Sequence, residues 1–170
     1  EAGARVTLVA GPPALDTPCG VRRIDVTTAG QMLEAVMAEA QDAEVFISVA
    51  AVADWRVDQA SEVKLKKTEA APPVLRLVRN PDILAQVAAL PARPYCVGFA
   101  AETGDLARNA RAKRAAKALD LIVANEAGAV LGAEEAELLV VDEHGEATWP
   151  KAGKLAQARR LVALVAERLR

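Results

Sequence analysis

Aromatic side chains make up only 3% of this chain, which also contains a single histidine and two cysteines. One histidine cannot build a histidine-rich zinc centre. The sequence around it, Asp142-Glu143-His144-Gly145, predicts a hairpin turn, which favours neither a serine–histidine triad nor a histidine general base. Any chemistry must therefore come from Lys, Asp, Glu, Asn and backbone groups.

Long apolar runs and clustered cysteines are also missing. No run approaches the roughly 18 residues of a membrane span, and no signal peptide precedes the first expected strand. Cys19 and Cys96 match no metal or redox spacing, so we interpret both as small buried residues in a reducing cytoplasm. With 21 basic and 23 acidic residues, no global basic field would attract nucleic acid. We expect a soluble cytoplasmic protein without nucleic-acid or membrane partners.

Apolar strands alternate with amphipathic helices along the 170 residues, which predicts one α/β domain with a mainly parallel sheet. Pro81 stands where a first helical residue would be. The expected strands are Arg5–Val9, Arg23–Val26, the buried Glu44–Val49, Val74–Val78, Cys96–Ala100 and Leu121–Ala124, followed by a hairpin from Leu138–Asp142 to Trp149. The expected helices follow Thr27-Thr28, begin at Pro81, span Asp105–Ala118 and span Lys154–Leu169.

The segment from Asp54 to about Pro73 is rich in charge and has little periodicity. It contains the lysine run Lys64–Lys67. Loops of this length in compact domains are commonly functional, so we interpret residues 54–73 as a lid over a site.

The stretch Val97–Asn125 is the most informative part of the chain. A strand brings Phe99 and a carboxylate to its carboxyl end, and the following helix carries Lys113 and Lys117 four residues apart. Residues at this spacing share a helical face, and strand ends in α/β sheets are where ligands bind. These features favour a polyphosphate substrate.

Five motifs in order give the chain a family resemblance. They are Ala50-Ala51-Val52-Ala53-Asp54-Trp55, the run Lys64–Lys67, Asn80-Pro81-Asp82-Ile83-Leu84, Gly98-Phe99-Ala100-Ala101-Glu102-Thr103, and the pair Lys113 and Lys117. Together they resemble phosphopantothenoylcysteine synthetase, usually the carboxy-terminal half of a bifunctional bacterial coenzyme A biosynthesis protein.

The resemblance implies a Rossmann-like three-layer fold and a ligase. Such enzymes use CTP to convert 4'-phosphopantothenate to an acyl-cytidylate, and L-cysteine then displaces CMP to give phosphopantothenoylcysteine. It also implies Mg²⁺ with the triphosphate, a homodimer, and a fused or associated phosphopantothenoylcysteine decarboxylase that alone would carry FMN.

The resemblance also implies roles for individual residues. Lys64 would be catalytic and would contact the nucleotide, and the remaining nucleotide-binding residues would be Ser48, Val49, Ala50, Asp54, Pro81, Asp82, Ile83, Leu84, Phe99, Lys113 and Lys117. Simpler interpretations stay open: a solvated basic helix face, an exposed loop lysine, a turn aspartate at Asp54, a helix-dipole partner at Asp82 and a core Phe99.

The match departs from the family in two places. The expected opening strand, Asn-Ser-Ser-Gly loop and helix do not precede Glu1, and Leu131 stands where the family often has an aromatic residue. An alternative is therefore a truncated, catalytically incomplete fragment that binds CTP or dimerises. A dinucleotide oxidoreductase is disfavoured because no G-x-G-x-x-G follows a strand.

Overall fold

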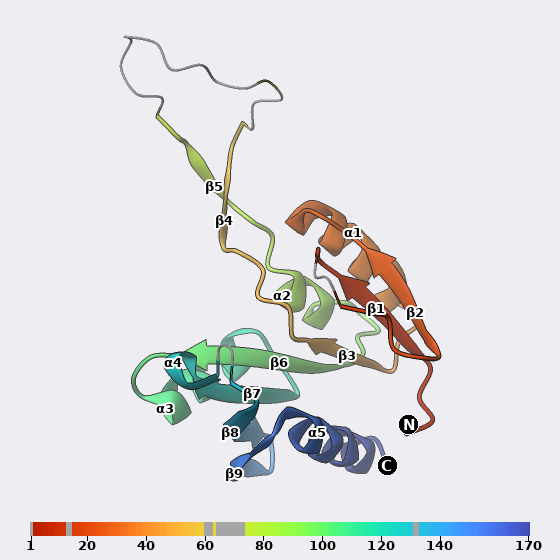
Figure 1. The fold of residues 1–170 in the computed structure, drawn as a ribbon, viewed down its shortest axis with the longest axis vertical. Helices are drawn as coiled ribbons and strands as arrows, with labels where there is room; N and C mark the ends of the chain where they lie inside the picture. The colour runs from red at the N-terminus through yellow and green to blue at the C-terminus, as the bar shows by residue number, and fades with distance from the viewer. Residues whose placement is uncertain (1, 13–14, 60–62, 64–73, 131–132) are drawn as a thin grey trace.

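The computed structural model describes residues 2–12, 15–59, 63, 74–130 and 133–170. Figure 1 labels their secondary structure along the chain. The strands are β1 (Val6–Ala10), β2 (Val21–Asp25), β3 (Val45–Ser48), β4 (Trp55–Val57), β5 (Leu77–Arg79), β6 (Tyr95–Glu102), β7 (Leu121–Glu126), β8 (Glu135–Asp142) and β9 (Gly145–Gly153). The helices are α1 (Ala29–Ala40), α2 (Ile83–Ala88), α3 (Leu106–Ala116), α4 (Ala127–Val130) and α5 (Lys154–Arg168).

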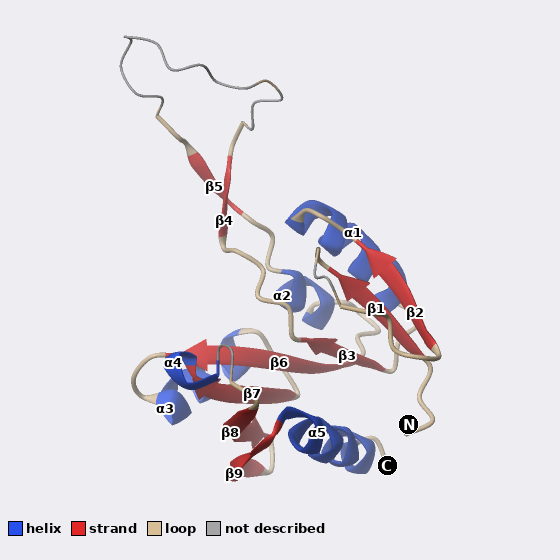
Figure 2. Cartoon of the chain, viewed as in Figure 1, coloured by secondary structure: helices blue, strands red, loops and turns tan. Residues whose placement is uncertain are grey.

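The main sheet has five strands in the order β3-β6-β7-β8-β9. β3, β6 and β7 are parallel, whereas β8 and β9 add antiparallel strands at one side. β1 and β2 form a separate parallel pair (Figure 2). The α/β prediction is confirmed, and so is the hairpin turn before Gly145, whose φ of 136° favours glycine.

Alternate residues of the central strands face two different apolar clusters. Cys96, Ala100 and Ile122 belong to the cluster that includes residues of α1, α2 and α3. Val97 and Val123 face the other way, into the cluster that includes residues of α5. This period of two, with helices on both faces, gives the expected three-layer arrangement.

Short side chains fix where the helices begin. Thr28 and Gln31 form a capping box at the start of α1. At α2 the prediction was wrong by two residues: the helix begins at Ile83, because the Asp82 carboxylate accepts from the Ala85 N–H and makes Asp82 the N-cap. Pro81 therefore precedes the cap.

The expected lid segment begins with a strand. β4 pairs antiparallel with β5, and the two form an arm that projects from the body of the protein (Figures 1 and 2). The sequence missed β4 because three paired residues are too few to show a period. Residues 60–62 and 64–73, including the lysine run, lie outside the described residues.

Two burial predictions were also wrong. β3 is only half buried, with 38% of Ile47 exposed, because β1 and β2 do not pair with its free edge. Cys19 is exposed, since it lies in the segment between β1 and β2, whereas Cys96 is buried in β6 as expected. No helix in the described ranges is long and apolar enough to cross a bilayer.

Candidate nucleotide-binding site

Each lysine of the predicted pair contacts a carboxylate from another element. Lys117 is the C-cap of α3, and its Nζ lies 2.7 Å from Asp82 Oδ2 at the start of α2. Lys113 Nζ lies 3.3 Å from Glu102 Oε1 at the end of β6. The helix is shorter than expected and ends at Ala116, yet the spacing still places both lysines beside β6 and α2. The role of the lysine pair in binding a nucleotide stays a prediction, and the two acidic partners were not predicted from the sequence.

Asp82 links α2 and α3 electrostatically. Burial acts to raise the pKa of its carboxyl, but hydrogen bonds from Lys117 and the Ala85 N–H, together with the charges of Lys117 and Lys113, outweigh burial and lower that pKa. Asp82 is therefore ionised at neutral pH, and the pair holds the Lys117 ammonium at a defined place. An incoming anion can replace the carboxylate as its partner.

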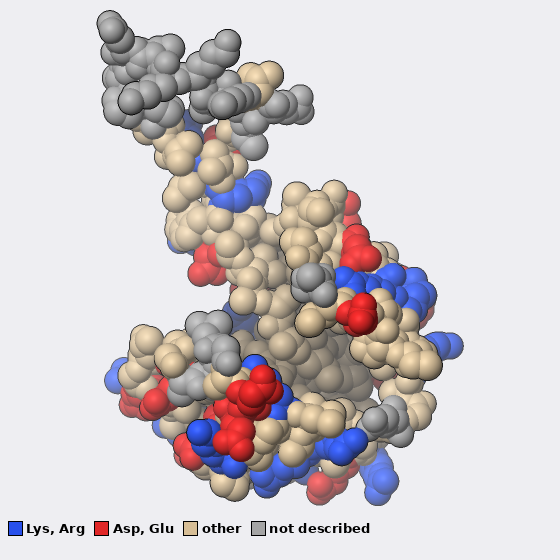
Figure 3. All heavy atoms as spheres, viewed as in Figure 1, with Lys and Arg blue, Asp and Glu red and all other residues tan. Residues whose placement is uncertain are grey.

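The lysine pairs lie near the carboxyl ends of β6 and β7, where ligands bind in α/β sheets. Figure 3 shows the surface notched between the base of the arm and this end of β6. Ser48, the last residue of β3, is half buried, and Val49 and Ala50 after it are exposed. Because β3 is parallel to β6, these three residues lie at the same edge of the sheet. Their small or backbone groups leave room for a ligand to approach.

Asp54 lies at the base of the arm. Its side chain is exposed, and its backbone carbonyl accepts from the Asn80 N–H at 2.8 Å. Since Asn80 stands only two residues before Asp82, the structure brings Asp54 and Asp82 to the same region. These two carboxylates come from segments separated by the whole arm.

Other predicted residues occupy different environments. The side chains of Ile83 and Leu84 are buried in the core, so they can offer a ligand only backbone groups, and Pro81 is half buried. Phe99 packs against the cluster on the α5 side of the sheet. Its place in a nucleotide pocket stays a prediction. Lys64 lies outside the described residues, so its catalytic role also stays a prediction.

The site offers positively charged lysine side chains for an anion but few ligands for a bare metal ion. Within the described ranges, no group of three or more His, Cys, Asp or Glu side chains is placed to hold a metal. Asp54 and Asp82 are both exposed, but Asp82 contacts Lys117 and the half-buried Glu102 contacts Lys113. The arrangement fits Mg²⁺ bound mainly through phosphate oxygens with one protein carboxylate, which is usual for Mg²⁺–nucleotide complexes.

Sequence reasoning missed two residues at the base of the arm. Arg56 Nη1 donates to the Arg79 carbonyl at 2.7 Å, and the Asn80 side chain donates to the Ala53 carbonyl at 2.7 Å. Asn80 belongs to a motif and stands before a proline, which was a signal for a special role. Nothing in the sequence distinguishes Arg56 from a surface arginine.

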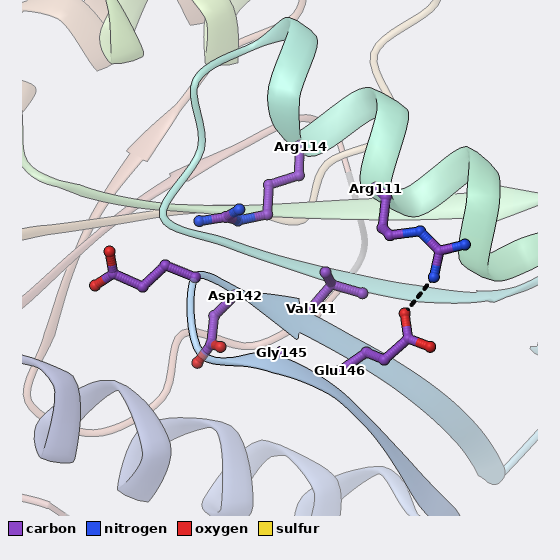
Figure 4. Close-up of a pocket in the computed structure, with 7 residues that line it drawn as sticks. Arg111, Arg114, Val141, Asp142, Gly145 and Glu146 are labelled. Carbon is purple, nitrogen blue, oxygen red and sulfur yellow. Dashed lines mark hydrogen bonds and ion pairs between the residues drawn. The ribbon is translucent and has the colours of Figure 1, made fainter.

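A hollow of about 430 Å³ lies elsewhere, between α3 and the β8–β9 hairpin. Figure 4 shows Arg111, Arg114, Asp142 and Glu146 around it, with Arg111 Nη1 2.5 Å from Glu146 Oε2. None of the predicted site residues lines it. Its arginines alternate with carboxylates and it is open to solvent, so it presents no concentrated charge for a nucleotide.

Comparison with known proteins identifies related sequences. The family model described as the DNA/pantothenate metabolism flavoprotein C-terminal domain matches residues 1–169. The coenzyme A biosynthesis bifunctional protein CoaBC of Vibrio cholerae is 42% identical over 174 residues, covering 99% of this chain and 44% of that protein. Its Vibrio parahaemolyticus counterpart is 52% identical over 128 residues, covering 74% of this chain and 32% of the relative. The chain thus spans less than half the length of these relatives.

A solved structure is also similar. The crystal structure of the C-terminal domain of a CoaBC protein superimposes with a TM-score of 0.82 at 31% identity. The match covers 98% of this chain and 76% of the solved one.

Proposed function

Because the chain belongs to the family of the DNA/pantothenate metabolism flavoprotein C-terminal domain, we propose that it acts in coenzyme A biosynthesis as the phosphopantothenate–cysteine ligase part of a bifunctional protein. One observation carries the nucleotide part of this proposal. Lys113 and Lys117 lie beside the N-cap of α2, near the carboxyl ends of parallel strands.

The proposed reaction has two steps. A carboxylate oxygen of 4'-phosphopantothenate attacks the α-phosphorus of CTP, forming an acyl-cytidylate while the bond to pyrophosphate breaks. The amine of L-cysteine then attacks the acyl carbon, an amide bond forms, CMP leaves and the amine loses a proton. Both steps bring anionic groups together, so positioned cations lower the barrier.

The lysines supply that positive charge. Binding of the triphosphate moves the Lys117 ammonium from the Asp82 carboxylate to a phosphate oxygen, and Lys113 leaves Glu102 in the same way. Charge-assisted hydrogen bonds of this kind are the stronger ones. Ser48, Val49, Ala50, Ile83 and Leu84 contribute backbone groups or small side chains, while Phe99 and Lys64 keep their predicted roles.

Mg²⁺ would neutralise further charge on the triphosphate when bound. The observed donors suit it through Asp54 and phosphate oxygens rather than through a protein cage. Asp54 would then orient the metal-bound end of the nucleotide.

Two partners follow from the same proposal. The relatives are bifunctional, so a decarboxylase carrying its own FMN would be fused to or associated with this chain. A second copy would cover the exposed apolar side chains of the arm, among them Trp55 and Leu77. We place the assembly in the cytoplasm.

The alternative is a fragment that binds CTP or dimerises but cannot catalyse the ligation. The match to the solved CoaBC domain covers 76% of that domain, so CTP binding and ligation are measured separately. Titration calorimetry with CTP, beside a pyrophosphate-release assay with 4'-phosphopantothenate and L-cysteine, separates the two. Binding with release supports the ligase, and binding without release supports the fragment.

Lys117→Ala tests the site itself. We expect the Kd for CTP to rise at least about tenfold, which corresponds to roughly 1.4 kcal/mol, because one charge-assisted contact to phosphate is lost. Lys151→Ala is the matched control, since Lys151 is 68% exposed and contacts Glu135 at 3.6 Å on the β8–β9 side. An equal effect of both substitutions, or no CTP binding by the parent chain, would contradict the proposal.

A further inference from the structure

Asn80 fastens the base of the β4–β5 arm. Its backbone N–H donates to Asp54 O at 2.8 Å, and its side-chain Nδ2 donates to Ala53 O at 2.7 Å. Arg56 Nη1 donates to Arg79 O at 2.7 Å and to Asn80 Oδ1 at 3.3 Å. We call these five residues, Ala53, Asp54, Arg56, Arg79 and Asn80, the arm clamp. Both functional groups of the Asn80 side chain are engaged in it.

Little else holds the described part of the arm. β4 and β5 pair over three residues each, and Trp55 and Leu77 remain 51% and 53% exposed. The Arg79 guanidinium lies over the Trp55 ring at 5.4 Å, outside the core. A two-stranded ribbon with so little burial is marginally stable in water. The arm clamp therefore decides how well the base of the arm is ordered.

The arm clamp also lies between two parts of the candidate site. On one strand it holds the backbone of Asp54. On the other strand, Asn80 is followed by Pro81, whose ring fixes φ, and then by Asp82, which contacts Lys117. Displacement of Asn80 would thus be transmitted to both carboxylates through very short segments.

We propose that Asn80 is a positioning residue for the nucleotide site: through the arm clamp it keeps Asp54 at a fixed separation from the Asp82–Lys117 pair. This inference rests on the proposed CTP binding. Without the clamp, the base of the arm samples other arrangements, and the nucleotide must select the competent one. The apparent affinity then equals the intrinsic affinity multiplied by the fraction of molecules that retain that arrangement.

Asn80→Ala in the 170-residue chain tests the inference with two measurements. We expect the Kd for CTP, from titration calorimetry, to rise about tenfold if the competent arrangement falls to roughly a tenth of molecules. Backbone hydrogen exchange at residues 55–58 should become faster, because the Asp58 N–H bond to Arg76 O lies in the same ribbon. Asn80→Asp keeps an acceptor for Arg56 but loses the donor to Ala53, so its affinity should lie between those of Asn80→Ala and the parent.

Gln86→Ala is the matched control. Gln86 is an exposed amide on α2, and the described residues give its side chain no hydrogen bond. The Gln86→Ala substitution should leave both the Kd for CTP and the exchange rates in the arm unchanged. If Asn80→Ala does not fold, Arg56→Ala replaces it, since that substitution removes only an exposed side chain of the arm clamp.

The outcomes separate the two proposals. If the parent chain binds CTP and the clamp variants bind it equally well, Asn80 is not a positioning residue, while the proposed function stands. If the parent chain does not bind CTP, the proposed function fails and this inference with it. Weaker binding that is matched by Gln86→Ala, or that comes without faster exchange in the arm, also overturns the inference.

Discussion

At the scale of single residues, Asp120 shows how a carboxylate can stabilise the start of a strand, here β6. Its two oxygens accept from Arg93 Nη1 at 2.5 Å, from Arg93 Nη2 at 2.8 Å and from the Cys96 N–H at 2.7 Å. Burial acts to raise the pKa of Asp120, but the Arg93 and Cys96 contacts outweigh burial and lower it. The ionised form is therefore the one that stabilises the fold.

We expect Asp120→Asn to reduce the free energy of unfolding by about 1–3 kcal/mol at neutral pH, since Arg93 and the Cys96 N–H lose a charged acceptor. A lowered folded pKa contributes stability above the unfolded value of about 3.8, and this contribution disappears as pH falls through the folded pKa. Urea unfolding of parent and variant between pH 7 and about pH 2 measures the difference, which should shrink in acid.

Asp25→Asn is the control for this substitution. Asp25 is 70% exposed and contacts Arg23, so the change should stay within about 0.5 kcal/mol at every pH. A loss at Asp120 that is constant across the pH range would show that the charge of this carboxyl is not what stabilises the fold.

Residue spacing predicted that Lys113 and Lys117 share a helix face, but not which acids they contact. Lys113 and Lys117 share one side of α3 because four residues make about one helical turn. Their partners Asp82 and Glu102 precede them by 35 and 11 residues and come from other elements. Long-range pairing depends on how α2 packs on the sheet, and a single sequence does not contain that information.

At the scale of elements, Gly98 sets the distance between β6 and its neighbours. A Cβ atom added there would lie 2.7 Å from Leu119 Cδ1 and 2.9 Å from Leu84 Cδ2. Leu84 belongs to α2 and both leucines are buried, so neither can turn towards solvent. The absence of a side chain at Gly98 therefore allows α2 to approach the strand.

We expect Gly98→Ala to lower the free energy of unfolding by about 1–3 kcal/mol through overpacking. Urea unfolding measures it, with Gly11→Ala as the control, because a Cβ atom at Gly11 meets nothing within 4 Å. Because α2 begins beside Asp82, the Gly98 variant should also bind CTP more weakly. Equal stability of the two variants would contradict this account of the packing.

Most elements could be predicted from the sequence, and the misses have physical causes. Period-two and helical patterns located the core strands and α1, α3 and α5 to within a few residues. β4 escaped because its three residues are exposed on both faces and so have no apolar alternation. The start of α2 was misplaced because the Asp82 side chain, rather than the Pro81 ring, supplies the start signal.

At the scale of the whole molecule, the arm predicts the assembly state. Trp55, Val74 and Leu77 expose 51%, 94% and 53% of their surfaces, an arrangement that favours burial against a second copy. We expect the parent chain to be a dimer by light scattering coupled to size exclusion, and Leu77→Lys to shift it towards monomer, since burying an unpaired charge is costly.

Leu155→Lys is the control for the assembly test. Leu155 lies on α5, away from the arm, and is 63% exposed. This variant should remain dimeric. A monomeric parent chain would contradict this prediction, and a dimer that survives Leu77→Lys but not Leu155→Lys would place the subunit contact elsewhere.

The pairing of each site lysine with an acid has a consequence for selectivity in the cell. Two ammonium groups and two carboxylates cancel, so the resting site presents almost no net charge to a small monovalent anion such as chloride. If the proposed CTP binding holds, the triphosphate would displace both acids at once and would recover the full electrostatic gain. Competition by millimolar cellular salts should consequently be weak, even though the site is built from lysines.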